Sequence, residues 1–261
     1  MQNALEVRYV LPRSNRRNAN PPLLFIHGAY CDAWCWEVHL LPWFAAAGYP
    51  AYALSLRGHG KSPGRDDLGS LHLTDYMDDI RNVVAELPAR PVLIGHSMGG
   101  AEVLRILAKA PGRVRKLVGL TPVSASPTPF DEAGHDLFWG AAEDPGKRFG
   151  IIDFTTGNRN TATWVQQVVD HSLSHSTTEG FAGALEAWAG PDFLAEIAGA
   201  QTPMLVIAGE HDPALGEATV RQTWEPHFPQ CEIHVMANAG HYPMLETPVQ
   251  LATVIERFLA D

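Results

Sequence analysis

Cysteine is scarce in this sequence, and long apolar runs are absent from it. Three cysteines occur among the 261 residues, at Cys31, Cys35 and Cys231. A small, odd number of thiols does not make a disulfide framework and is typical of a reducing compartment. No second pair of metal ligands accompanies Cys31 and Cys35 at a suitable spacing. All three cysteines are therefore interpreted as small buried hydrophobic residues. Because Met1 is not followed by an apolar leader and no run reaches transmembrane length, we expect a cytoplasmic protein.

Positive charge is also in short supply. Lysine and arginine number 19 against 29 acidic residues, which gives a net charge of −10. A surface of this sign repels phosphate groups, so neither a nucleic acid nor an anionic membrane is expected as a partner. The hydrophobic content of 46% is that of an ordinary globular protein. We therefore expect a small-molecule partner, and the sequence leaves open whether the chain is a monomer or a homodimer.

Short β-like runs alternate with amphipathic helical patterns through most of the chain. This alternation is typical of an α/β fold in which helices cover both faces of a mostly parallel sheet. The first run, Leu5–Leu11, alternates polar and apolar residues and predicts an antiparallel edge strand. The other predicted strands are Leu23–His27, Ala51–Leu56, Pro91–Gly95, Lys116–Thr121, Met204–Ala208 and Cys231–Met236. Helices are predicted near Trp36–Ala47, Thr74–Leu87, Met98–Ala110, Gly216–Glu225 and Pro248–Leu259.

The alternation stops after Pro122 and resumes near Gln201. About 80 residues with helix-like patterns but no clear strand are too many for a loop. We predict that residues 123–200 form a helical lid, and that 1–122 and 201–261 form the core. An insertion at the carboxyl ends of parallel strands lies over the crevice in which such sheets bind ligands. Its many aromatic residues would line a pocket or, equally well, form the core of the insertion itself.

The most informative stretch leads from the strand-like run Val92–Ile94 into Gly95-His96-Ser97-Met98-Gly99, with a helical pattern behind it. G-x-S-x-G between a strand and a helix is the signature of a nucleophile elbow. The turn is so tight that the serine adopts a strained backbone conformation and projects its hydroxyl above the sheet. Ser97 is therefore the predicted nucleophile.

A serine nucleophile needs a histidine base and an acid that orients the base. In a fold with this elbow the acid comes first along the chain and the histidine second, each just after a strand. Asp212 and His241 stand in those two places, and Glu210 is the competing acid. His96 lies inside the elbow, where its ring is expected to point away from the nucleophile.

His171 and His175 are spaced four residues apart, with Glu179 beyond them. This spacing suits a metal pair on one helix face, but no H-E-x-x-H motif surrounds them. We expect a polar face of the lid there and no metal site.

Acyl transfer also requires two N–H donors for an oxyanion. One is the N–H of Met98, which follows the nucleophile. The loop after the second predicted strand carries Gly28, which lets the backbone turn its amides toward Ser97, so Ala29 is the predicted second donor and Tyr30 the alternative. The residues predicted to line the substrate pocket are Tyr30, His96, Phe130, Phe138, Trp139, Trp164 and Trp188.

Together these motifs resemble the α/β-hydrolase superfamily along the whole chain. The resemblance rests on His27-Gly28, Arg57-Gly58-His59-Gly60-Lys61-Ser62, Gly95 to Gly100, Gly209-Glu210-His211-Asp212 and Gly240-His241. The run from His27 to Trp36 is also similar to the plant methylesterase and hydroxynitrile lyase branch. The resemblance implies an eight-stranded sheet, a Ser-His-Asp triad and a lid inserted after the sixth strand, and it implies no cofactor.

Three functions of different classes remain. The leading one is a carboxylesterase-type serine hydrolase that cleaves small, mainly apolar esters through an acyl-enzyme; thioester and C–C cleavage are related alternatives. The second is a cofactor-independent dioxygenase, but its acid would follow the strand Lys116–Thr121, where no carboxylate occurs before Asp131. The third is a non-enzymatic receptor, which an intact set of Ser97, Asp212 and His241 disfavours.

Overall fold

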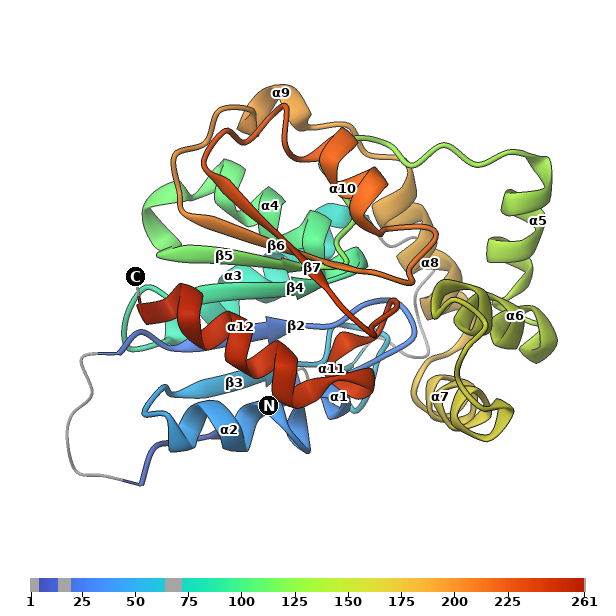
Figure 1. Ribbon diagram of the computed structural model, residues 1–261, viewed down its shortest axis with the longest axis horizontal. Helices are drawn as coiled ribbons and strands as arrows, with labels where there is room; N and C mark the ends of the chain where they lie inside the picture. The colour runs from blue at the N-terminus through green and yellow to red at the C-terminus, as the bar shows by residue number, and fades with distance from the viewer. Residues whose placement is uncertain (1–4, 14–19, 64–71, 261) are drawn as a thin grey trace.

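The computed structural model describes residues 5–13, 20–63 and 72–260, and a seven-stranded sheet lies at its centre (Figure 1). In spatial order the sheet runs β1-β3-β2-β4-β5-β6-β7. Strand β1 is antiparallel to β3, and all the other neighbours are parallel. The predicted mostly parallel sheet with an antiparallel edge strand is thus confirmed. The strands are β1 Val7–Val10, β2 Leu23–Ile26, β3 Ala51–Leu54, β4 Val92–His96, β5 Lys116–Leu120, β6 Met204–Gly209 and β7 Cys231–Met236.

The strand count differs from the one implied by the resemblance. The described residues hold seven strands rather than eight, and each coincides with one of the β-like runs of the sequence. The helical insertion therefore follows the fifth of these strands instead of a sixth.

Helices cover both faces of the sheet. Helices α2 (Leu40–Ala46) and α12 (Pro248–Ala260) pack together in front of it, while α3 (Leu73–Glu86) and α4 (Met98–Lys109) pack together behind it (Figure 1). Strands β2, β4 and β6 are buried along their whole length, which accounts for their unbroken apolar runs.

One predicted helix is divided in two. In place of Trp36–Ala47 the chain forms α1 (Trp34–Glu37) and α2, which begins two residues before Pro42. Proline has no N–H to donate to the preceding turn, so it is accommodated in a first helical turn but not in a continuous helix.

The segment between β5 and β6 is helical, as predicted. Its helices are α5 Glu132–Gly140, α6 Pro145–Thr155, α7 Ala162–His175, α8 Thr178–Ala189 and α9 Leu194–Ile197. The remaining helical segments of the described residues are η1 (Pro111–Arg113, a 3-10 turn before β5), α10 Glu217–Thr223 and α11 Pro243–Glu246.

The insertion contacts the loops that follow the strands. The N–H of His241, beyond β7, donates to the carbonyl of Thr155 at 3.1 Å, and that of Gly60, beyond β3, donates to His175 at 2.9 Å. The ring of Tyr30, beyond β2, packs edge-on against Phe181 of α8 with centroids 5.0 Å apart. These contacts place the insertion at the carboxyl edge of the sheet, on the side of α5–α8 in Figure 1.

The cysteines are free thiols, of which Cys31 and Cys35 are buried and Cys231 is half-buried. Burial raises the pKa of Cys35 well above its usual range, so this thiol stays protonated and packs as a small apolar group. Among the described residues, no helix combines the length and apolar character needed to cross a membrane.

Candidate active site

Ser97 occupies the turn between β4 and α4 with φ 54° and ψ −119°. Positive φ is unfavourable for a residue with a Cβ and persists only where the surroundings impose it. Here the N–H of Ser97 donates to Leu120 at 3.1 Å, and its carbonyl accepts from Gly100 and Val123 at 2.8 and 2.9 Å. The side chain is half-buried, between neighbours that are fully buried. The predicted turn from strand to helix is therefore present, and Ser97 is the partly exposed residue within it.

The glycines of the elbow are required by the close approach of strand and helix. A Cβ on Gly95 would lie 2.2 Å from the carbonyl oxygen of Gly99. A Cβ on Gly99 would lie 2.8 Å from the carbonyl oxygen of Ile26 on the neighbouring strand. Real Cβ atoms do not approach oxygen this closely, so neither position accepts a larger residue without a backbone shift.

Asp212 and His241 meet in the loops beyond β6 and β7. Nδ1 of His241 lies 2.6 Å from Oδ2 of Asp212, and both side chains are almost wholly buried. The other oxygen of Asp212 accepts the N–H groups of Ala214 and Leu215 at 2.9 and 3.0 Å. The carboxylate is thereby fixed with one oxygen reserved for the imidazole. A short, buried hydrogen bond of this kind holds a histidine in a single orientation and tautomer.

The competing acid lies elsewhere. Glu210 has a half-exposed side chain and accepts the N–H of Asn238 at 2.9 Å. It has no contact with His241 among the hydrogen bonds of the described residues, so geometry favours Asp212.

The backbone of His241 is tied to the strands that flank Ser97. Its carbonyl accepts Nε2 of His96 at 2.8 Å and the hydroxyl of Thr121 at 3.0 Å. His96 immediately precedes Ser97, and Thr121 follows Leu120, the acceptor of the Ser97 N–H. In the described part of the chain no hydrogen bond joins the Ser97 hydroxyl to His241, which is common in ligand-free active sites. Sequence reasoning missed Thr121, although its φ of 40° marks a second strained turn at this edge.

The loop after β2 lies directly against the serine. A Cβ on Gly28 would lie 2.7 Å from Cβ of Ser97 and 2.9 Å from Nδ1 of His96. The absent side chain lets the backbone of Gly28 and Ala29 pass this close to the nucleophile. The N–H groups of Ala29 and Met98 donate to no acceptor within the described residues, so both remain available to an anion.

His27 holds the backbone of this loop in place through hydrogen bonds, a role that the sequence did not reveal. One ring nitrogen, Nδ1, lies 2.8 Å from the carbonyl of Gly28, while Nε2 accepts the N–H of Leu56 at 2.9 Å. Burial disfavours the imidazolium form and, with the nearby His59, lowers the pKa of His27 to about 3. The ring is therefore neutral and serves as one donor and one acceptor.

Four of the predicted pocket residues form one aromatic cluster in the insertion. The ring of Phe130 lies 4.9 Å from Phe138, 5.4 Å from Trp139 and 5.9 Å from Trp188, centroid to centroid. Such mutual packing gives the insertion a hydrophobic core of its own. The remaining three lie apart from this cluster: Tyr30 packs on Phe181, His96 is buried beside His241, and Trp164 packs edge-on against Tyr242 at 6.2 Å.

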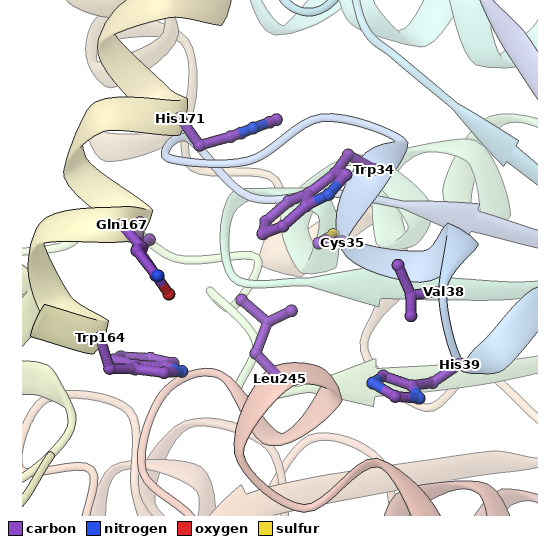
Figure 2. A pocket seen from close by; sticks show the side chains of 9 residues that line it. Trp34, Cys35, Val38, His39, Trp164, Gln167, His171 and Leu245 are labelled. Carbon is purple, nitrogen blue, oxygen red and sulfur yellow. The ribbon is translucent and has the colours of Figure 1, made fainter.

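Trp164 also lines a separate pocket of about 460 Å³ (Figure 2). This pocket lies between α1, α7 and α11, and its lining includes none of Ser97, Asp212 and His241. His171 and His175 lie on α7, where the sequence predicts a polar face of the lid. The ring of His171 stacks on Trp34 at 4.2 Å and contacts the buried Asp32.

Comparisons with known proteins agree with this architecture. A model of the alpha/beta hydrolase family matches residues 23–254. A non-heme chloroperoxidase from Streptomyces lividans is 33% identical over 212 residues, which are 73% of this chain and 74% of that protein. Esterase YbfF from Escherichia coli K12 is 26% identical over 260 residues, 95% of this chain and 96% of the esterase. Among solved structures, a bromoperoxidase from Bacillus anthracis is similar in fold with a TM-score of 0.84 at 19% identity, covering 100% of this chain and 97% of its own.

Proposed function

The chain belongs to the alpha/beta hydrolase family, and on that premise we propose that it is a serine hydrolase of carboxylic esters. The observation that carries the proposal is the 2.6 Å hydrogen bond between Asp212 and His241, at the sheet edge where the strained Ser97 stands. A buried carboxylate on Nδ1 makes the other ring nitrogen, Nε2, a proton acceptor. A neutral imidazole with a free Nε2 is what a serine hydroxyl needs in order to become nucleophilic.

In the proposed reaction, Nε2 of His241 accepts the proton of the Ser97 hydroxyl as Oγ bonds to the ester carbonyl carbon. The carbonyl oxygen becomes an oxyanion, which the N–H groups of Met98 and Ala29 stabilise. His241 then donates its proton to the departing alkoxide, leaving the acyl group on Ser97. Water then attacks this acyl-enzyme. His241 takes a proton from the water and returns it to Oγ of Ser97 as the bond between Oγ and the acyl carbon breaks, and the acid is released. Each proton transfer in this reaction therefore involves a group of the protein or a solvent molecule.

The loop geometry supports the two oxyanion donors. Met98 is the first residue of α4, so its N–H has no partner within the helix and the helix dipole adds positive potential there. The space beside Gly28, where a Cβ would meet Ser97, is consistent with a close approach of the loop that carries Ala29. His27 holds the carbonyl of Gly28 and thus the orientation of that peptide.

We further propose that residues 123–200 act as a lid that selects the substrate. The support is the contact of α6, α7 and α8 with the loops around the site and the aromatic cluster built on Phe130. Apolar and aromatic walls favour apolar acyl or aryl groups, because water leaves such surfaces on binding.

The dioxygenase reading finds less support. It calls for an acid after β5, where the structure has Thr121, whose hydroxyl donates to the carbonyl of His241. The acid on the imidazole is instead Asp212, beyond β6.

One alternative use of the same acyl-enzyme is favoured by the comparisons. Several relatives, including the one from Streptomyces lividans, are named non-heme chloroperoxidases or haloperoxidases. If hydrogen peroxide replaces water as the attacking group, the acyl-enzyme yields a peroxy acid, which can oxidise a halide ion. This second candidate needs the same Ser97. Its substrates are a carboxylic acid, which loses water when it acylates Ser97, hydrogen peroxide and the halide ion.

A substrate panel tests the proposal. We expect p-nitrophenyl esters of increasing chain length to be hydrolysed without uptake of oxygen, and faster than matched thioesters and lactones. Peroxy-acid formation from acetate and hydrogen peroxide, measured beside it, separates the second candidate. Oxygen uptake during turnover, or tight ligand binding with no turnover of any ester, would contradict the assignment.

A further inference from the structure

A second cluster of ionisable side chains lies outside the set of Ser97, Asp212 and His241. It joins Asp32, on the loop after β2, to His171 and His175 on α7. One ligand atom of each residue lies within 4.8 Å of those of the other two. We propose that these three residues bind a divalent transition-metal ion of the zinc class.

The residue types suit such an ion. Zinc is bound by imidazole nitrogen and carboxylate oxygen at about 2.0–2.2 Å, with tetrahedral geometry. Two such ligand atoms therefore stand about 3.4 Å apart. Nε2 of His171 and Oδ2 of Asp32 are 3.1 Å apart, so these two atoms need to separate only slightly to bind the same ion.

Neighbouring groups orient each ligand for this task. Oδ1 of Asp32 accepts the N–H of Trp34 at 2.7 Å, which leaves Oδ2 facing His171. Nδ1 of His175 lies 2.9 Å from the carbonyl of His171, so its Nε2 is left with a free lone pair. Metal-binding imidazoles generally donate their second nitrogen to a carbonyl or carboxylate in this way.

Stacking fixes the ring of His171. The ring faces Trp34 of α1 (Figure 2). Its centroid lies 4.2 Å from that of Trp34 and 4.0 Å from that of His175 within α7. The interplanar angles are 24° and 12°. Trp34 thus keeps the His171 ring beside Asp32. The lone pair of an imidazole nitrogen lies in the ring plane, so the His175 ring must rotate out of this stack before both histidines can bind one ion.

The buried negative charge of Asp32 favours the binding of a cation. The carboxylate is fully buried, and among the described residues it forms no ion pair with lysine or arginine. A buried anion without a permanent cation is unfavourable, and a bound metal ion would remove that penalty.

The site is also open to an incoming ion. His171 and His175 are half-buried rather than fully buried. His171 borders the pocket of about 460 Å³ that Trp34 and Trp164 also line (Figure 2). With three protein ligands, a water molecule would complete the tetrahedron.

A metal ion here would join the insertion to the core. Asp32 follows the loop of Gly28 and Ala29, while the two histidines belong to α7, and the backbone bond from Gly60 to His175 already fixes that helix nearby. The ion would act as a cross-link between these segments. The proposal is independent of the esterase assignment, because it concerns binding alone.

Calorimetric titration of metal-free protein with zinc chloride tests the site. We expect one zinc ion per chain with micromolar affinity or tighter. His171→Gln and His175→Gln should each weaken binding by about tenfold or more, since each removes a ligand. His227→Gln is the matched control, a half-buried histidine beyond α10, and should bind zinc like the unaltered protein. Dissociation constants of the two ligand variants within threefold of the control would overturn the proposal.

X-ray absorption at the zinc edge gives a readout on the unaltered protein. The proposal predicts two imidazoles and oxygen ligands around the ion. A spectrum with one imidazole or none would place the zinc elsewhere and overturn it, whatever the variants do to stability. Circular dichroism of each variant checks that a loss of binding is not a loss of fold.

Discussion

The carboxylate of Asp212 lies 2.6 Å from Nδ1 of His241, although the two residues belong to different loops and are 29 positions apart in the chain. Both side chains are buried, and the second oxygen of Asp212 is held by two backbone N–H groups. This pair orients the proposed base. It is the part of the site on which the account of catalysis most depends.

Asp212→Asn should lower kcat by several orders of magnitude while leaving the fold intact. An amide at this place would present an N–H to the imidazole and hold it in the wrong tautomer. Steady-state kinetics on a short p-nitrophenyl ester measure the effect. Glu210→Gln is the matched control, because Glu210 is half-exposed and bonded to Asn238. An inactive Glu210→Gln beside a fully active Asp212→Asn would reverse the assignment of the acid.

Gly28→Ala should lower kcat/KM by about 100-fold, the usual effect of losing one oxyanion donor. The new methyl group would lie 2.7 Å from Cβ of Ser97, so the loop with the Ala29 N–H must move away. Gly150→Ala in α6 is the control, since nothing lies within 4 Å of a Cβ there. Activity of Gly28→Ala within threefold of the control would show that this loop does not supply a donor.

Glu102→Gln should stabilise the protein at alkaline pH. Glu102 is fully buried in α4, and both of its carboxyl oxygens lack a partner among the described residues. Burial, together with Asp79, raises the pKa of this carboxyl well above its usual value of 4.5. Above that value the unfolded chain is ionised while the folded chain keeps its proton, so stability falls as pH rises.

The glutamine cannot ionise and escapes this loss, so its advantage should grow from pH 5 to pH 8 and reach roughly 1 kcal/mol or more. Urea unfolding at the two pH values measures it, with the exposed Glu86→Gln as control. A variant that is less stable than the unaltered protein at pH 8 would contradict the expectation.

Replacement of residues 123–200 by a short Gly/Ser linker should reduce selectivity among esters more than it reduces activity on small ones. Small activated esters need only the triad and the oxyanion donors, whereas bulky esters also need the walls above them. The ratio of kcat/KM for long and short p-nitrophenyl esters is the readout, in a variant whose fold is verified. Phe130→Ala, within the aromatic cluster, is a milder test of the same idea. Equal losses on both ester classes in both folded variants would show that the segment does not select substrates.

Local sequence patterns predicted much of this molecule. The seven β-like runs became the seven strands, because each combines an apolar core with turn residues at its ends. Gly95 to Gly99 predicted the elbow, since the steric demand of that turn acts within a few residues. The division of a helix before Pro42 could also have been read from the missing N–H.

Contacts between distant segments were beyond sequence reasoning. Nothing local to His171 indicates that its ring meets Asp32, which is 139 positions away, so the sequence predicted only a polar face of the lid. The support of the His241 carbonyl by Thr121, 120 positions away, is of the same kind. Such contacts depend on how the insertion and the loops pack against the folded sheet. The spacing of residues along the chain does not contain this information.

The identity of the nucleophile is the central claim, and covalent labelling tests it most directly. The protein is treated with a fluorophosphonate, and the modified peptide is identified by mass spectrometry, in the unaltered chain and in Ser97→Ala, with Ser124→Ala as control. The account predicts a single label on Ser97, its disappearance in Ser97→Ala, and ester turnover there reduced to a residual of about 10³-fold over water. A label on any other residue, or full turnover without Ser97, would contradict it.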